Sequence, residues 1–148
     1  RGAENLIVKK GGLRQPAQVD DLTFDENGNP TSSDHLYMNG GEIFNFTSEA
    51  VPVLVGQVLE KNKLQQDDIS LFVFHQANKY MMNYLRKLID IEQDKFYYCI
   101  EKVGNTVSST IPIALYEASK EGKLSGNVLL AGFGVGYSWG ATILKCVD

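Results

Sequence analysis

From about Gly41 onward, short apolar runs alternate with segments in which apolar residues recur at helical spacing. The run Ile69–Phe74 follows two aspartates and has the length of a buried strand, as does Asn127–Ala131. Phe96–Ile100 is aromatic and β-branched, which predicts another strand. A glycine-rich turn then leads into a last strand from about Tyr137 to Cys146.

The helical spacing begins near Ile43 and continues to Leu59, with Pro52 inside the pattern. Proline either kinks one long helix or lies near the start of a second helix, which Thr47 or Ser48 would cap. Two further helices are predicted over Lys79–Ile89 and Thr106–Lys120.

Alternation of helices and strands predicts an α/β fold with a mixed, mostly parallel sheet and helices on both faces. The tight final turn makes the last strand antiparallel to its neighbour. Before this region, Asn5–Lys9 is a candidate short strand, and Gly11–Asp34 is rich in turn residues and contains a candidate hairpin. We therefore divide the chain into an N-terminal strand and surface excursion (1–37) and a C-terminal domain (38–148).

The composition is that of a globular protein, with 43% hydrophobic and 22% charged residues among 148. A net charge of -4 argues against a nucleic-acid surface. No apolar run reaches the roughly 20 residues of a membrane span, and no signal peptide opens the chain, so we expect a cytoplasmic protein with reduced thiols. Two cysteines and two histidines far apart in sequence make a zinc site improbable, and no cofactor is expected.

Three polar or glycine-rich segments follow predicted strands. They are His75–Asn78, Gly104–Thr106 and Gly132–Gly136. In open α/β sheets, ligands bind beyond the carboxyl ends of the strands. If the three strands are parallel, the three segments lie at the same edge of the sheet.

The three segments have a joint chemistry. His75 Nε2–H and the side-chain NH₂ of Asn105 can both donate to a carbonyl oxygen that gains negative charge, and a glycine-rich turn can offer backbone N–H groups to a second oxyanion. Each feature also has a structural explanation. The histidine can simply close a strand, Gly-Asn is common turn chemistry, and glycines allow a tight hairpin.

The segment from Met38 to Lys145 resembles the C-terminal half of β-ketoacyl-acyl-carrier-protein synthase III, a thiolase-fold condensing enzyme of fatty-acid synthesis. Three motifs carry the resemblance in order: "HQAN" at 75–78, "GNT…S…IP" at 104–112 and "GFGVGYSWGA" at 132–141. The resemblance implies a decarboxylating Claisen condensation of acyl-CoA with malonyl-acyl-carrier protein.

The resemblance also implies residue roles. His75 and Asn105 would stabilise the malonyl-derived enolate, and the backbone of Gly134 and Val135 would help to bind the acyl thioester oxygen. Residues near the pantetheine arm or the reaction chamber would be Phe44, Asn78 and Phe133.

The family's nucleophilic cysteine lies in the N-terminal half, at a buried helix start. Cys99 falls in a predicted strand and Cys146 near the chain's end, so neither is assigned that role. The first residue is arginine, which suggests a processed chain or an excerpt. We therefore expect a chain that is inactive alone and needs the N-terminal half, in an enzyme that is a homodimer.

A polar, basic stripe is predicted on the helix after "HQAN", formed by Lys79, Asn83, Arg86 and Lys87. The resemblance implies that Lys79, Arg86 and Lys87 receive the acidic carrier protein, while the alternative is a solvated helix face. Two further functions stay open: another thiolase-fold acyltransferase, as in secondary metabolism, and a non-catalytic acyl- or carrier-binding module.

Overall fold

The computed structural model describes residues 2–13, 15–16 and 20–147. The chain divides into two compact units. Unit 1 comprises Arg1–Asn45 with Gly134–Tyr137, and unit 2 comprises Phe46–Phe133 with Ser138–Asp148. The domain division after residue 37 stays a prediction.

Unit 1 is built from two-residue strands. β1 (Leu6–Ile7) pairs antiparallel with β4 (Tyr37–Met38), and β2 (Thr23–Phe24) pairs antiparallel with β3 (Pro30–Thr31). Asp25 shapes the turn between β2 and β3, because its carboxylate accepts hydrogen bonds from two backbone N–H groups of that turn. The short first strand and the hairpin predicted for this region are confirmed.

The first helix, α1 (Gly40–Asn62), is continuous and contains Pro52, so the alternative of one long helix is correct. Thr47 is not a cap. It is buried inside α1, and its Oγ1 lies 3.7 Å from Met81 Sδ. The buried apolar side chains of α1 recur at helical spacing, at Val51, Val55, Val58 and Leu59.

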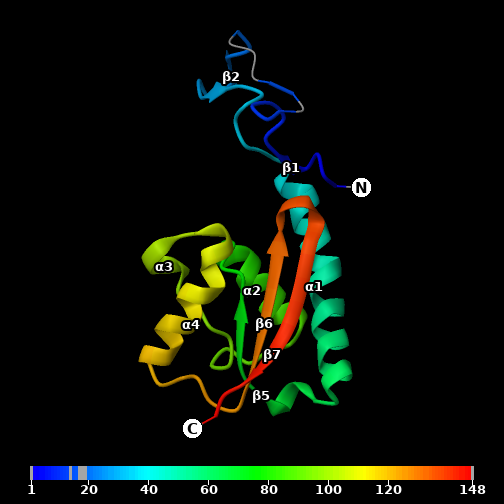
Figure 1. Cartoon of the computed structure of the whole chain (residues 1–148), viewed down its shortest axis with the longest axis vertical. Helices are drawn as coiled ribbons and strands as arrows, with labels where there is room; N and C mark the ends of the chain where they lie inside the picture. The colour runs from blue at the N-terminus through cyan, green and yellow to red at the C-terminus, as the bar shows by residue number, and fades with distance from the viewer. Residues whose placement is uncertain (1, 14, 17–19, 148) are drawn as a thin grey trace. The chain divides into compact units, whose positions relative to one another are not determined.

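Unit 2 contains a sheet of three strands in the order β5-β6-β7. β5 (Ile69–Phe74) and β6 (Asn127–Gly134) are parallel. β7 (Ser138–Lys145) lies beside β6 and returns after the 3₁₀ turn η3 (Val135–Tyr137), so it runs antiparallel (Figure 1). The mixed sheet and the antiparallel last strand are confirmed. The three-stranded sheet, as far as it is described, has one parallel and one antiparallel pair of strands, so it is not mostly parallel as expected.

The strand predicted over Phe96–Ile100 is absent from the described structure. Only Phe96 joins the sheet, through a single parallel bridge to Phe72 of β5. The Tyr97 N–H donates to the Phe72 carbonyl at 3.0 Å, after which the chain leaves the ladder. The aromatic side chains are there because the segment is buried against β5, where Phe96 stacks edge-on with Phe74 at 4.9 Å between ring centroids.

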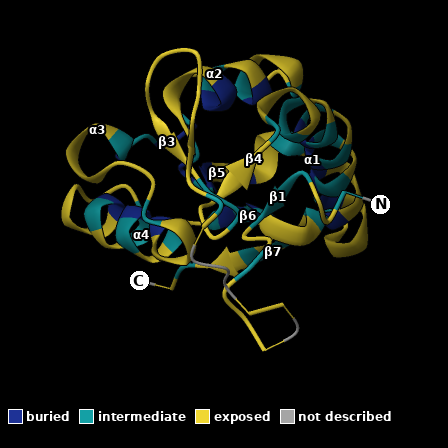
Figure 2. Cartoon of the chain, turned by 90° about the horizontal axis from the view of Figure 1, so that it is seen from above, coloured by how far each residue is buried: buried dark blue, intermediate teal, exposed yellow. Residues whose placement is uncertain are grey.

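Helices cover both faces of the sheet, as predicted: Figure 2 shows α4 on one side and α1 with α2 on the other. α2 (Lys79–Leu88) matches the predicted helix, and the helix predicted from Thr106 begins as a 3₁₀ turn, η2 (Val107–Ser109), before α4 (Thr110–Lys120). The remaining short elements are η1 (Gln66–Asp68) and α3 (Ile100–Val103).

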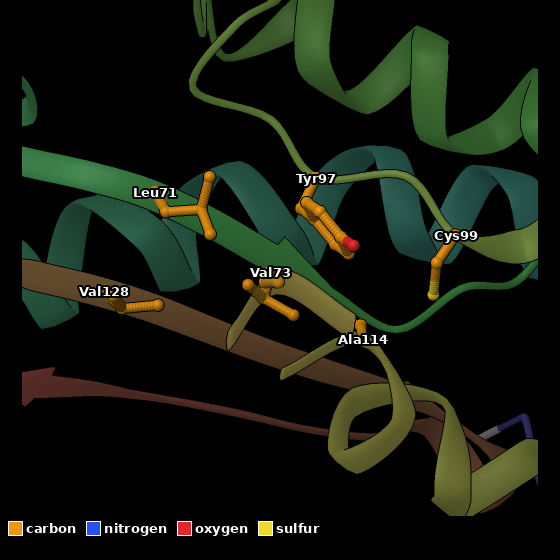
Figure 3. Close-up of a cluster of buried hydrophobic side chains, with 7 residues drawn as sticks. Leu71, Val73, Tyr97, Cys99, Ala114 and Val128 are labelled. Carbon is orange, nitrogen blue, oxygen red and sulfur yellow. The ribbon is translucent and has the colours of Figure 1, made fainter. Parts of the chain in front are cut away.

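One buried cluster fixes α4 against the sheet (Figure 3). Ala114 and Ala118 of α4 are both fully buried, and their small side chains let the helix backbone approach β5 closely. This close packing sets the position of the N-terminus of α4. The cluster consists of Leu71, Val73, Tyr97, Cys99, Ala114, Ala118 and Val128.

Candidate active site

The carboxyl ends of β5 and β6 bring His75 and Phe133 together. The strands are parallel with Phe74 opposite Ala131, and the His75 N–H donates to the Ala131 carbonyl at 2.8 Å. The imidazole of His75 meets the ring of Phe133 edge-on, with centroids 5.4 Å apart and planes at 86°. Phe133 is buried, so one flank of the imidazole faces an apolar wall.

The ring of His75 is held at one nitrogen. Its Nδ1 lies 2.6 Å from Oγ1 of Thr110, the first residue of α4. Burial lowers the pKa of His75, because the charged imidazolium loses hydration there. The imidazole is therefore neutral near pH 7, with one nitrogen as donor and the other as acceptor.

Asn105 is oriented by the backbone that follows it. Its Oδ1 accepts a hydrogen bond from the Val107 N–H at 2.9 Å, so the amide oxygen is occupied and the NH₂ group is available to a ligand. Val107 holds a φ of 54°, which is rare for a β-branched residue. Gly104, at a φ of 68°, makes the turn that leads into this segment.

A chain of contacts links the two predicted donors. Thr110 Oγ1 lies 3.0 Å from the carbonyl oxygen of Val107 and 2.6 Å from Nδ1 of His75. Asn105, Val107, Thr110 and His75 thus form one connected group within unit 2. The reason predicted for this proximity was wrong, because Asn105 lies in the loop between α3 and η2 and does not follow a strand.

Within the glycine-rich segment, the residues from Gly134 onward belong to unit 1, as does Phe44. Gly134 ends β6, and Val135 opens η3 and is exposed. Tyr137 of this turn accepts a hydrogen bond from Asn5 Nδ2 at 2.6 Å through its hydroxyl group, and that hydroxyl donates to the Glu42 carbonyl at 3.3 Å. Phe44 is partly buried in α1. The roles of Gly134, Val135 and Phe44 stay predictions.

Gln76 of the "HQAN" motif was missed by the sequence argument. It is fully buried, and its Nε2 donates to the Phe74 carbonyl at 2.8 Å and the Tyr97 carbonyl at 3.3 Å. Its Oε1 accepts the Cys99 N–H at 3.0 Å. A side chain therefore replaces the missing strand pairing after Phe96 and satisfies buried backbone groups. The feature of the sequence that could have indicated this role is a glutamine close to the end of an apolar run.

Asn78 caps α2. Its Oδ1 accepts the Met81 N–H at 2.8 Å, as expected for an N-cap residue. The motif thus combines a candidate hydrogen-bond donor (His75), a buried side chain that bonds backbone groups (Gln76) and a helix cap (Asn78). The pantetheine role of Asn78 stays a prediction beside this structural one.

The three basic residues of the predicted stripe on α2 lie in three different environments. Lys79 pairs with Glu101 at 2.5 Å, and both side chains are exposed. Arg86 is partly buried, and its Nη1 donates to the Ile91 carbonyl at 2.8 Å, which ties the end of α2 to the following loop. Lys87 is exposed. Among the three basic residues, Arg86 therefore has a clear structural function.

The two cysteines are free. Cys99 is buried in the core cluster, and burial together with Glu117 raises the pKa of its thiol. Cys146 is partly buried just after β7. Within the described ranges, no group of three or more His, Cys, Asp or Glu residues could hold a metal ion. No helix of that part of the chain is long and apolar enough to span a bilayer.

This fold and site define the C-terminal half of a thiolase-fold condensing enzyme. The family model described as "3-Oxoacyl-[acyl-carrier-protein (ACP)] synthase III C terminal" matches residues 59–146. The chain therefore belongs to the β-ketoacyl-acyl-carrier-protein synthase III family, of which it carries the C-terminal region.

Two individual relatives support this family assignment. The chain is 43% identical over 114 residues to β-ketoacyl-[acyl-carrier-protein] synthase III of Oceanobacillus iheyensis, covering 76% of this chain and 36% of the relative. The Clostridium perfringens (strain SM101) protein of the same name is 37% identical over 144 residues, covering 96% and 42%. The chain thus spans about two fifths of the length of these relatives.

Solved structures show the same fold. A 3-oxoacyl-(acyl-carrier-protein) synthase III crystal structure superposes with a TM-score of 0.93 at 41% identity, covering 99% of this chain and 44% of that one. The 3-oxoacyl-(acyl-carrier protein) synthase from Burkholderia xenovorans LB400 gives a TM-score of 0.82 at 36% identity, covering 97% and 41%.

Proposed function

We propose that this chain is the C-terminal half of a β-ketoacyl-acyl-carrier-protein synthase III that joins acyl-CoA to malonyl-acyl-carrier protein with loss of CO₂. The chain together with the proposed N-terminal half is called the complete enzyme below. The observation that carries the proposal is the connected group of His75, Thr110, Val107 and Asn105, which supplies a neutral imidazole and an oriented amide.

His75 and Asn105 act on the malonyl thioester. When the bond to the carboxylate breaks and CO₂ leaves, the electron pair moves onto the thioester carbonyl and makes an enolate. The Nε2–H of His75 and the NH₂ of Asn105 donate to that oxygen and stabilise it more than the uncharged carbonyl. Because the imidazole is neutral and already oriented, it donates without proton transfer.

The enolate carbon then attacks the acyl thioester on the enzyme's cysteine. The backbone N–H groups of Gly134 and Val135 would bind the oxyanion that forms, and collapse of this intermediate expels the cysteine thiolate. Phe133 supports the proposed chamber because its buried ring flanks the imidazole. Phe44 and Asn78 would lie along the pantetheine arm.

The nucleophilic cysteine comes from the proposed N-terminal half. A reactive cysteine needs a lowered pKa, whereas burial raises the pKa of Cys99. Two observations support a missing half: the relatives are more than twice as long, and in the described part of the chain β7 is an edge strand with exposed Trp139 and Leu144. Exposed apolar edge strands are normally covered in the complete protein. The chain alone is therefore inactive.

The substrates imply the remaining partners. The acidic carrier protein would dock on Lys79, Arg86 and Lys87, and the complete enzyme would be a cytoplasmic homodimer without a bound cofactor. The carrier-binding module without catalysis is the main competing function, because it would use the same helix.

The test is a condensation assay with acyl-CoA and malonyl-carrier protein. The complete enzyme should form the β-ketoacyl product, and the 148-residue chain alone should not. Turnover by the chain alone would overturn the half-enzyme proposal. Carrier binding without any condensation by the complete enzyme would favour the binding module.

A further inference from the structure

The side chain of Gln76 is 1% exposed, and its hydrogen bonds define the orientation of its amide. The NH₂ group donates to the carbonyls of Phe74 and Tyr97, and the side-chain oxygen accepts the Cys99 N–H. The reverse orientation would face an acceptor toward two carbonyl oxygens, which cannot donate. The side chains of Tyr97 and Cys99 also pack in the core cluster, but apolar packing has no direction, whereas hydrogen bonds fix how the backbone is turned.

The segment that Gln76 holds leads directly to Asn105. Cys99 precedes the short helix α3, and it is the Cys99 N–H that Gln76 accepts at 3.0 Å. At the other end of α3, the Gly104 N–H donates to the Ile100 carbonyl at 2.8 Å, and Asn105 is the next residue. Because α3 is a single hydrogen-bonded turn, the position of Asn105 depends on where the backbone of Cys99 is held.

The contacts that α3 makes itself lie mainly at the surface. Ile100 is half-buried, and the three residues that follow it are exposed. Two ion pairs join α3 to its neighbours, Lys79–Glu101 to α2 and Lys102–Glu117 to α4. Both pairs contain an exposed lysine, and ion pairs that are open to water contribute little to stability. The buried hydrogen bonds just before α3 therefore hold it more firmly than its own ion pairs do.

The backbone of Val107 makes this attachment necessary. Its φ of 54° is unfavourable for a β-branched residue, and such a conformation persists only where the surrounding structure holds it. On the C-terminal side, the chain is held by α4, which packs into the core cluster. On the N-terminal side, Gln76 holds the start of α3. If that attachment loosens, Val107 relaxes toward negative φ, and its N–H turns away from Oδ1 of Asn105.

We propose that Gln76 is a positioning residue for Asn105: its buried hydrogen bonds hold α3 and thereby keep Val107 in the conformation that orients the Asn105 amide. This rests on the proposed function of Asn105 as a donor, although the environment of the amide is measured independently of activity. Gln76 touches neither the substrate nor the reacting atoms in this account.

The experiment is proton–nitrogen NMR of the side-chain amides in the complete enzyme labelled in asparagine. The Asn105 signal is assigned by its disappearance in Asn105→Ala. Gln76→Met keeps the length of the side chain and removes its hydrogen bonds, so it should shift or broaden that signal. Gln76→Glu at about pH 6 should restore it, because a buried carboxyl stays uncharged and offers one donor and one acceptor. Gln57→Met, at an exposed site on α1, is the matched control and should leave the signal unchanged.

Activity gives the second measurement. Malonyl decarboxylation by Gln76→Met should lose about tenfold to a hundredfold in kcat with little change in KM, because a donor is displaced from the enolate oxygen. In an Asn105→Ala background, the same substitution should cost less than about twofold, because the group that it displaces is absent. A substitution that only lowered the folded fraction would reduce the rate equally in both backgrounds.

The outcomes separate the two proposals. An unchanged Asn105 signal in Gln76→Met, or an equal loss of decarboxylation in both backgrounds, overturns the positioning role of Gln76. A changed signal together with wild-type decarboxylation by Asn105→Ala supports the role of Gln76 and contradicts the donor role of Asn105. If Gln76→Met does not fold, Gln76→Glu decides: ionisation of its carboxyl at higher pH removes the donor, so the Asn105 signal should leave its wild-type position. A signal that stays there throughout that ionisation overturns the role of Gln76.

Discussion

The side-chain oxygen of Asn105 accepts a hydrogen bond from the backbone N–H of Val107 at 2.9 Å. This contact distinguishes the two ends of the amide, since the oxygen accepts a hydrogen bond inside the loop and the NH₂ group carries the two donor hydrogens that a ligand oxygen needs. The backbone of Val107 meets Asn105 at its N–H and Thr110 at its carbonyl, at a φ of 54°. The strained backbone of Val107 therefore contacts Asn105 directly and reaches His75 through Thr110.

Asn105→Asp tests this relationship. The aspartate keeps an oxygen for the Val107 N–H, so the loop should keep its conformation, but it replaces the donor with a negative charge beside the enolate. Decarboxylation by the complete enzyme should fall about a hundredfold to a thousandfold, with little change in unfolding midpoint. Retention of near wild-type activity by this variant would rule out the donor role.

Gln76→Leu tests whether the buried hydrogen bonds of Gln76 to the backbone stabilise the fold. The substitution leaves the Cys99 N–H and the Tyr97 carbonyl buried without partners, which should lower the free energy of unfolding by about 2 kcal/mol or more. Urea denaturation measures it. Gln57→Leu, at an exposed site on α1, is the matched control and should change stability by less than about 0.5 kcal/mol. Equal effects of the two variants would contradict the role of Gln76.

The lowered pKa of His75 predicts a dependence of stability on pH. In the unfolded chain the imidazole binds a proton near its ordinary pKa of 6.5, whereas the folded state resists that proton. The unfolded state then holds more protons, so the free energy of unfolding falls as the pH drops below about 6.5 toward the lowered folded pKa.

His75→Gln removes this contribution, and His35 is common to both proteins. Between pH 7.5 and about 5.5, the wild type should lose more stability than the variant in parallel denaturant titrations. If the free energy of unfolding changed with pH to the same extent in both proteins, burial of His75 would not affect the folding equilibrium.

Lys87→Glu and Arg86→Glu separate carrier binding from structure. Lys87 is exposed, so its reversal should weaken binding of the acidic carrier most at low salt and leave stability unchanged. Arg86 donates to the Ile91 carbonyl, so its reversal should also lower the unfolding midpoint. Calorimetric titration at two salt concentrations measures the first effect. Unchanged affinity in Lys87→Glu would support the solvated-face alternative.

Periodicity predicted the parts of the fold that depend on local patterns. The boundaries of β5 match the apolar run Ile69–Phe74, and α2 lies where the helical spacing indicated. The strand predicted over Phe96–Ile100 failed because the side chain of Gln76 replaces the backbone pairing after Phe96. A side chain that substitutes for a strand leaves no periodic signal in the segment that it supports.

The candidate site was predicted in its residues but not in its geometry. His75 was expected at a strand end and lies there, whereas Asn105 reaches the group through the left-handed backbone of Val107. Valine gives no indication of a positive φ, since β-branched residues avoid that region. Thr110 was not singled out because its importance comes from the packing of α4, which brings its hydroxyl to Nδ1 of His75.

The central claim is that His75 stabilises the enolate formed from the malonyl thioester. Its most direct test is the rate of malonyl-carrier decarboxylation by His75→Ala in the complete enzyme, measured separately from acyl transfer onto the nucleophilic cysteine. The account predicts a loss of about a hundredfold or more in decarboxylation with acyl transfer retained. Decarboxylation at the wild-type rate, or loss of acyl transfer alone, would contradict it.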